Sequence, residues 1–431
     1  MQAKIINYKN KNFSAQINNI LQQNSVVNHD LQARVVSIID QVKQLGDQAI
    51  IAICNQFDSA DFKKADDLLV SSKEIQLAKK NLDPKLLAAL KTAYKRIYSY
   101  HKKQLPKNFL YKDEIGVALG NKWQPIEKVA VYVPGGTAIY PSSVLMGAVP
   151  ALVAGVKNIV MAVPSNAGKI ADSVLVAADL CGIKTIYKMG GAAAIAALAL
   201  GTDRVRKVDK IIGPGNSYVA LAKKQLFGEV GIDMVAGPTD ILIIADNKIN
   251  PTWVAADMLS QLEHGVDSKA VLITDDLKFA NLVNDALAKL TPQLLRREII
   301  EKSLSENGLI IIVENLAKDG PEIANLFAPE HLEIATSKPE LIAKKITNAG
   351  AIFMGKYSPE AIGDYIAGPS HTLPTMGTAR FSSGLSVFDF LKRISIISCS
   401  KKGFDKLKDQ TALLADNEGL TAHKLSITIR K

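Results

Sequence analysis

The stretch that decides the fold holds two short runs of strand-forming residues, Val129-Ala-Val-Tyr-Val133 and Asn158-Ile-Val-Met-Ala-Val163. The segment between them is rich in alanine and long enough to form a helix. Strand-like runs that alternate with helical segments are typical of βαβ units, in which helices cover a parallel sheet. These two runs therefore predict two parallel strands joined by a helix.

The same alternation continues through most of the chain. Six further runs follow: Lys184–Tyr187, Val208–Ile212, Asp240–Ala245, Ala270–Thr274, Leu309–Val313 and Ala349–Phe353. Eight runs are too many for one small sheet, so we expect an α/β protein with two parallel-sheet units.

The two ends of the chain differ from this middle part. Leu31–Phe57 and Asp83–Gln104 carry apolar residues at helical spacing, so residues 1–110 are expected to be mostly helical. The last forty residues contain a basic stretch broken by glycine and a short apolar alternation. We expect them to form a small appended piece outside the sheets.

Length and cysteine content narrow the class of protein. A chain of 431 residues is too long for one compact core. Cys54, Cys181 and Cys399 form no CxxC pair, which disfavours a disulfide framework or a thiolate zinc site and favours a reducing cytoplasm. The N-terminus has no apolar signal region, and proline and glycine interrupt the apolar stretch 129–164. Neither a secretory signal nor a membrane helix is expected.

The net charge of +10 raises the question of nucleic acid binding. The segment from Lys79 to Lys107 holds nine basic residues and one acidic residue, Asp83. Such a helix could follow a phosphate backbone. No helix-turn-helix, zinc-finger or RNP-like motif accompanies it, so we favour a solvated helix face and no nucleic acid partner.

Four of the six histidines lie in polar segments rich in glycine, proline or acidic residues: His264, His331, His371 and His423. A single histidine of this kind is more often a hydrogen-bonded structural residue. Four of them with carboxylates nearby could converge on one metal site with nitrogen and oxygen ligands.

The segment from Asn250 to Gly265 allows a geometric test of that idea. Asn250 suits the N-cap and the next residue is proline, so a helix should begin there. At about 100° per residue, Gln261 and His264 fall on one face, whereas Glu263 points about 100° away. The spacing predicts that Gln261 and His264, rather than Glu263, would bind a metal.

Two further segments carry candidate acid–base groups. Glu330-His331 follows Pro329, which is expected to start a turn of helix and to present an adjacent carboxylate and imidazole. Asp364 is expected in a short helix that begins after Ser358.

Two glycine-rich turns follow predicted strands, at Pro134–Gly136 and at Gly213–Asn216. The second resembles a dinucleotide fingerprint, but Tyr218 stands where the third glycine would be. These turns alone are weak support for a phosphate site.

Several blocks together resemble the histidinol dehydrogenase family, and the likeness covers essentially the whole chain. The longest block runs from Ile232-Asp-Met-Val-Ala-Gly-Pro-Thr-Asp240 through Asp257-Met-Leu-Ser-Gln-Leu-Glu-His264. The others are Val131-Tyr-Val-Pro-Gly-Gly136, Gly213-Pro-Gly-Asn216, Ala328-Pro-Glu-His-Leu-Glu333, Gly363-Asp364 to Thr375, Ala379-Arg-Phe-Ser-Ser383 and Glu418-Gly-Leu-Thr-Ala-His423.

The resemblance implies an enzyme of histidine biosynthesis that oxidises L-histidinol to L-histidine with two NAD⁺ and one Zn²⁺ per subunit. It also implies a homodimer. Each subunit would have two Rossmann-like domains, a helical N-terminal piece and a small C-terminal domain that is exchanged between subunits. The implied segments are 1–24 for the N-terminal piece, 25–130 with 238–385 for the zinc and substrate domain, 131–237 for the NAD domain and 386–431 for the C-terminal domain.

Site residues carry over by motif. The implied zinc ligands are Gln261, His264, Asp364 and, from the partner subunit, His423. Glu330 and His331 would be the catalytic pair, and Tyr132 and Asn216 would contact NAD. The residues around the substrate would be Thr239, Gln261, His264, His331, Asp364, His371, Glu418 and His423.

Three positions depart from the family pattern. Thr239 and Asp240 stand where the family usually has Ser-Glu, and Thr239 keeps the hydroxyl group. Ala193 stands where the family commonly has Gln, so one amide contact to NAD is missing.

Two other enzyme classes stay open from the sequence. A related zinc and NAD dehydrogenase could act on another small polar alcohol, although His371 and Glu418 suit an imidazole ring. A zinc hydrolase could use Glu330 or Glu263 to activate water without NAD.

Overall fold

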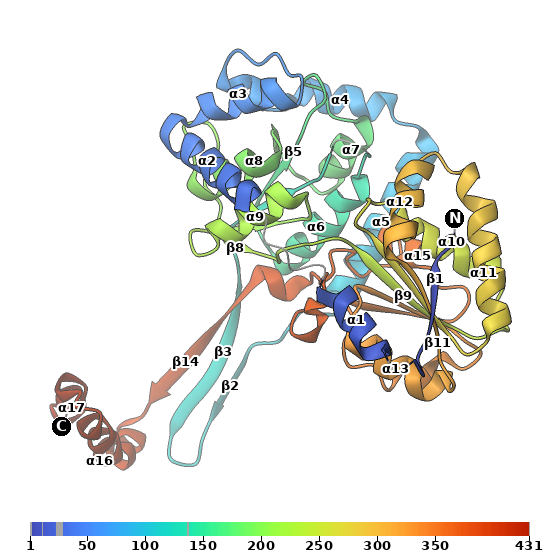
Figure 1. Ribbon diagram of the computed structural model, residues 1–431. Coiled ribbons are helices and arrows are strands. Elements are labelled where there is room, and N and C mark those ends of the chain that lie inside the picture. The colour runs from blue at the N-terminus through green and yellow to red at the C-terminus, as the bar shows by residue number, and fades with distance from the viewer. Residues whose placement is uncertain (1, 11, 23–28, 136–137, 431) are drawn as a thin grey trace.

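The computed structural model describes residues 2–10, 12–22, 29–135 and 138–430. Two parallel sheets form the body of the molecule, and a long antiparallel ribbon projects from it (Figure 1). The two parallel sheets confirm the predicted fold class, an α/β protein with two parallel-sheet units.

The first sheet has six parallel strands in the order β1-β11-β10-β9-β12-β13. Helices cover both faces, with α10, α11 and α12 on one and α1, α13 and α14 on the other. The strands are β1 (Lys4–Asn7), β9 (Asp240–Ala245), β10 (Lys269–Thr274), β11 (Gly308–Ile312), β12 (His331–Ala335) and β13 (Ala351–Met354). The helices are α1 (Phe13–Gln22), α10 (Pro251–Leu262), α11 (Leu277–Leu290), α12 (Arg297–Asn307), α13 (Leu316–Phe327), α14 (Pro339–Ala343) and α15 (Glu360–Tyr365).

The second sheet has five parallel strands in the order β6-β5-β4-β7-β8. Helices α4 to α7 pack on one face, and α2, α3, α8 and α9 pack on the other. The strands are β4 (Lys128–Tyr132), β5 (Asn158–Val163), β6 (Thr185–Lys188), β7 (Lys210–Ile212) and β8 (Gly231–Ile232). The helices are α2 (His29–Leu45), α3 (Asp47–Phe57), α4 (Ser72–Asn81), α5 (Pro84–Lys102), α6 (Pro141–Ala154), α7 (Asp172–Leu180), α8 (Gly191–Leu200) and α9 (Ser217–Leu226).

Near the N-terminus, the helices pack on a different sheet from the one that the expected domain boundaries imply. Residues 29–102 were assigned to the first domain, but their apolar faces pack against the five-stranded sheet through residues such as Ile50 and Ile97. The N-terminal piece is not wholly helical, because β1 pairs with β11 at the edge of the first sheet. Which sheet a helix covers depends on long-range packing that its own periodicity does not encode. The expected boundary at residues 24 and 25 lies outside the described residues.

The antiparallel ribbon joins distant parts of the chain. Its strands are β2 (Phe109–Lys112), β3 (Val117–Pro125) and β14 (Leu391–Cys399), in the order β14-β3-β2. Helices α16 (Lys401–Asn417) and α17 (Thr421–Thr428) follow β14 at the far end of the ribbon, away from both parallel sheets (Figure 1). The last forty residues thus form an appended arm, as expected, but β14 holds it on a sheet that the sequence did not predict.

No helix in the described parts of the chain is long and apolar enough to cross a membrane. Short 3₁₀ helices occupy Ala65–Leu68, Thr291–Gln293, Thr378–Arg380 and Val387–Phe390.

Candidate active site and cofactor pocket

A buried acid–base cluster lies at the amino ends of β9 and β12, which are neighbours in the six-stranded sheet. The segment before β12 is not a turn of helix as predicted. Helix α13 ends at Phe327, its C-cap Ala328 has a left-handed conformation, and after Pro329 the chain passes directly into the strand at His331. Pairing of His331 with Ile241 brings Glu330 beside Asp240.

Hydrogen bonds fix the carboxylate of Glu330. Its Oε2 atom accepts the Thr239 hydroxyl at 2.5 Å and the Asp240 backbone N–H at 3.2 Å. The backbone N–H of Glu330 donates to Asp240 Oδ1 at 2.9 Å. Burial raises the pKa of Glu330 to about 7, although His331 opposes the shift. The carboxylate is therefore held in a fixed position, and its pKa lies near neutral pH, as suits a general base.

The ring of His331 is buried between these groups and helix α15. Its Nδ1 atom lies 3.1 Å from the backbone oxygen of Asp240, which favours a proton on Nδ1. Its Nε2 atom lies 3.8 Å from both Glu360 Oε1 and Asp364 Oδ1. Burial lowers the pKa of His331, but the neighbouring carboxylates, Glu330 first, outweigh burial and raise it to about 10.

Helix α10 carries Gln261, His264 follows the helix just after its C-cap Glu263, and the predicted start of the helix is confirmed. Asn250 caps it by accepting the Thr252 N–H at 2.9 Å, and the helix begins at Pro251. Gln261, near its C-terminal end, is fully buried, and its Oε1 atom has no hydrogen-bond partner among the described residues. Its side-chain amide donates to the hydroxyl of Thr239.

His264, Glu360 and Asp364 form a group whose candidate ligand atoms all lie within 4.8 Å of one another. The group contains predicted His264 and Asp364 and leaves out Glu263. Glu360 was missed, although its i, i+4 spacing to Asp364 on a short helix could have indicated it. Helix α15 begins at Glu360 with Pro359 as its N-cap, and the carboxylate of Glu333 accepts the Glu360 N–H at 2.6 Å.

The loop after α15 reaches the second sheet's helices and carries His371. Arg96 of α5 donates to the carbonyls of Ile366 at 2.8 Å and Ala367 at 3.1 Å. The hydroxyl of Ser370 donates to the Met146 carbonyl of α6 at 3.3 Å. His371 Nε2 is buried without a partner among the described residues, and burial lowers the pKa of this ring. These contacts set His371 at the junction of the two parallel-sheet units.

Two predicted site residues lie outside this cluster. Glu418 follows α16 and His423 lies in α17, and both are exposed on the arm. Figure 1 shows that α17 is remote from β9, and therefore from the six-stranded sheet to which β9 and β12 belong. One chain therefore does not bring Glu418 and His423 to the other site residues.

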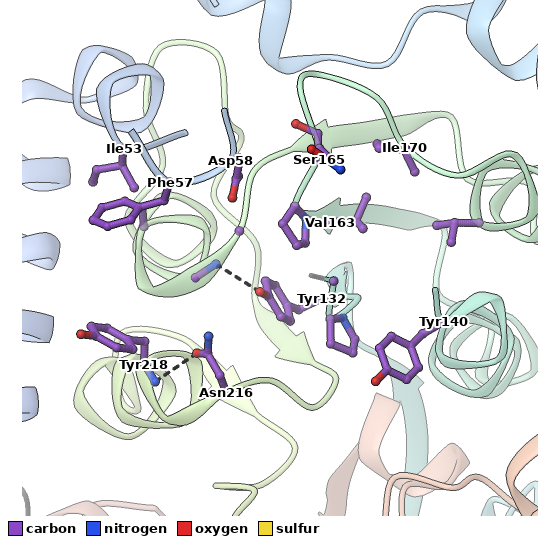
Figure 2. A pocket seen from close by; sticks show the side chains of 18 of the residues that line it. Ile53, Phe57, Asp58, Tyr132, Tyr140, Val163, Ser165, Ile170, Asn216 and Tyr218 are labelled. Atoms are coloured by element: carbon purple, nitrogen blue, oxygen red, sulfur yellow. Dashed lines mark hydrogen bonds between the residues drawn. The ribbon is translucent and has the colours of Figure 1, made fainter. Parts of the chain in front are cut away.

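A cavity of about 840 Å³ lies at the carboxyl ends of β4, β5 and β7 (Figure 2). The strand order reverses between β4 and β7, and ligands of doubly wound sheets bind at such a switch point. Both predicted NAD contacts, Tyr132 and Asn216, line the cavity. The Tyr132 hydroxyl accepts the Gly191 N–H at 3.1 Å at the start of α8. Asn216 caps α9 by accepting N–H groups of the following turn.

The sequence departures fall in both sites. Thr239 retains a hydroxyl that bonds to Glu330, and the Asp240 carboxylate accepts the Glu330 backbone N–H. The contact of Asp240 with His331 is made by its backbone carbonyl and does not depend on the side chain. Ala193 lines the cofactor cavity with only a methyl group. Gly136, predicted in the turn after β4, lies outside the described residues.

Comparisons with known proteins agree across the chain. A family model described as histidinol dehydrogenase matches residues 21–431. The chain is 47% identical over 425 residues to a histidinol dehydrogenase of Rhizobium meliloti, covering 99% of this chain and 98% of the relative. It is 48% identical over 401 residues to one of Rhodospirillum rubrum, covering 93% of this chain and 92% of the relative.

A solved structure supports the same relationship. The crystal structure of histidinol dehydrogenase from Elizabethkingia anophelis aligns with a TM-score of 0.93 at 36% identity, covering 99% of this chain and 98% of that chain. The similarity thus includes the whole fold as well as the sequence blocks. This chain belongs to the histidinol dehydrogenase family of NAD-dependent oxidoreductases.

Proposed function

We propose that the protein is a zinc-dependent enzyme that oxidises L-histidinol through the aldehyde to L-histidine, with two NAD⁺ per substrate. The observation that carries the proposal is the buried pair of Glu330 and His331, which adjoins the group of His264, Glu360 and Asp364. The six-stranded unit would bind zinc and histidinol, and the five-stranded unit would bind NAD.

The residues present fit a zinc ion. Gln261 Oε1 is buried without a partner among the described residues, and His264 and Asp364 offer one nitrogen and one oxygen ligand close together. With His423 of the partner subunit they would make a four-ligand set. Zinc bound there would hold and polarise the alcohol oxygen of the substrate. The positive charge of the zinc ion would also counteract the neighbouring carboxylates that raise the pKa of His331.

His331 is the proposed base for the first oxidation. Its Nδ1 is occupied by the carbonyl of Asp240, so Nε2 is the atom that can accept the hydroxyl proton of histidinol as hydride passes to NAD⁺. The backbone carbonyl of Asp240 would keep the ring in this tautomer and orientation, while the Asp240 carboxylate accepts the Glu330 backbone N–H.

Glu330 is the proposed base for the second oxidation. The aldehyde must first add water, and a buried carboxylate with a pKa of about 7 can take a proton from that water near neutral pH. The Thr239 hydroxyl and the Asp240 N–H orient this carboxylate. A second hydride transfer from the aldehyde hydrate to NAD⁺ then gives the carboxylic acid.

The remaining substrate contacts would come from two subunits. Thr239 and His371 belong to the body, whereas Glu418 and His423 would reach the site from the partner's arm. The antiparallel ribbon and the arm expose many large apolar side chains, as a surface covered in a homodimer would. They are Leu110, Tyr111, Ile394, Ile397, Leu413, Leu414, Leu425 and Ile429.

A cysteine-free variant tests this carboxylate route against a thiol route. Cys54 and Cys181 are buried, and burial raises the pKa of each thiol to about 12, so neither is a nucleophile near neutral pH. Cys399 lies on the remote strand β14. Replacing all three by Ala should leave histidinol-dependent NADH formation within about threefold of wild type. Loss of turnover in a folded variant that still binds zinc would favour a thiohemiacetal intermediate.

The three cysteines are free in the structure, which supports the proposed location in a reducing cytoplasm.

A further inference from the structure

Asp58 stands out among the residues that the structure describes around the cofactor cavity. It is the acidic residue of that lining, and Lys169 is the basic one. Asp58 is half-buried, and no described residue gives its carboxylate a hydrogen bond or an ion pair. Burial accordingly raises its pKa to about 6, so the group remains mostly charged at neutral pH and lacks a partner.

The backbone around Asp58 is held firmly. The Asp58 N–H donates to the Cys54 carbonyl at 2.9 Å, and the Asp58 carbonyl accepts the Ala167 N–H at 3.0 Å. Ser59 and Ala167 have φ values of 50° and 48°, in the left-handed region that side chains other than glycine rarely adopt. Strain of this kind is found mainly where function requires a fixed geometry.

Asp58 lies at the end of the cavity that is farther from the catalytic cluster. Figure 2 shows Asp58 beside Phe57, and Tyr140 on the other side of Tyr132. The pKa of Tyr365 is raised by burial first, then by Asp364 and, more weakly, by Tyr140. Tyr140 is therefore close to Tyr365 and Asp364 at the catalytic cluster. A dinucleotide that delivers its nicotinamide to the cluster would therefore place its adenosine near Asp58.

After the glycine-rich turn that follows β4, the sequence supplies no acid where dinucleotide-binding folds usually have one. Asp233 stands about 20 residues after the second turn, but it pairs with Lys223 and lies outside the cavity lining. The residue that binds the ribose commonly follows the glycine-rich turn by about 20 residues. From Lys128 to Ala171 this chain has no Asp or Glu at all. A carboxylate in the cavity must come from another segment, and the end of α3 provides it.

We propose that Asp58 accepts hydrogen bonds from the 2′- and 3′-hydroxyl groups of the adenosine ribose and thereby makes the enzyme prefer NAD over NADP. The inference rests on the proposed binding of NAD in this cavity. A carboxylate is an acceptor for both hydroxyls and repels the 2′-phosphate of NADP. Lys169, on the loop that Ala167 ties to Asp58, would attract that phosphate once the acid is removed.

The test measures kcat/KM for NAD and NADP at saturating L-histidinol. Asp58→Asn should lower the value for NAD about tenfold and raise that for NADP, shifting the preference by about 30-fold or more. Adding Lys169→Ala should remove the gain with NADP. Asp61→Asn is the matched control, because Asp61 lies outside the cavity lining and pairs with Lys63. It should leave the preference unchanged.

Phe57→Ala tests whether NAD binds in the cavity, separately from whether Asp58 sets the coenzyme preference. Phe57 lines the cavity and is 71% exposed, so its loss should spare the fold and raise KM for both coenzymes. If Phe57→Ala does so but Asp58→Asn keeps the wild-type preference within about twofold, the role of Asp58 is refuted while the cavity assignment stands. If neither variant changes either KM, the cavity is not the NAD site and both proposals fail.

Discussion

Mixed dimers of His331→Ala and His423→Ala subunits are expected to recover about a quarter of wild-type activity, although each variant alone should be nearly inactive. His331 belongs to the cluster in the body, and His423 lies on the exposed helix α17 at the end of the arm. If the arm completes the partner's site, one site of a mixed dimer carries both lesions and the other carries neither. Random pairing makes half of the dimers mixed.

The experiment refolds the two variants together and compares NADH formation with that of each variant alone. Mass measurement of differently tagged subunits confirms that mixed dimers are present. If His423 served its own subunit, every site would carry one lesion and activity would stay at the level of the single variants. That result, with folded mixed dimers in the sample, would refute the shared site.

Substituting His264 or Asp364 by Asn should weaken zinc binding by about 100-fold or more, because each change removes one proposed ligand. Glu263→Gln is the matched control. It alters a carboxyl group next to His264 that lies outside the group of His264, Glu360 and Asp364. Zinc content after dialysis at controlled free zinc gives the readout independently of activity.

Equal zinc loss from Glu263→Gln would show that the ligand face of α10 is assigned wrongly. Retention of zinc by Asp364→Asn would instead point to Glu360 as the carboxylate ligand, since both lie in the same group. Either result would overturn the ligand set proposed here.

Features set by local chemistry could be predicted from the sequence. The cap and first residue of α10 follow from Asn250 and Pro251, and the buried strands β5 and β9 follow from unbroken apolar runs. Helix geometry placed Gln261 and His264 on one face, but α10 ends at Leu262, so the position of His264 depends on the turn that follows the helix.

Features set by contacts between distant segments could not be predicted. The role of Asp240 depends on strand pairing that brings it beside Glu330. The start of β12 was misread because Pro329 suits both a helix and a strand entry, and only the neighbouring strand β9 decides between them. Asp58 reaches the cofactor cavity because α3 packs on the five-stranded sheet, which its own sequence does not reveal.

In the proposed mechanism one site performs both oxidations with Glu330 and His331, and the ratio of NADH formed to L-histidinol consumed tests this. We expect two NADH for each histidinol, with L-histidine as the product and no free aldehyde. One NADH per histidinol, with the aldehyde accumulating in solution, would contradict it.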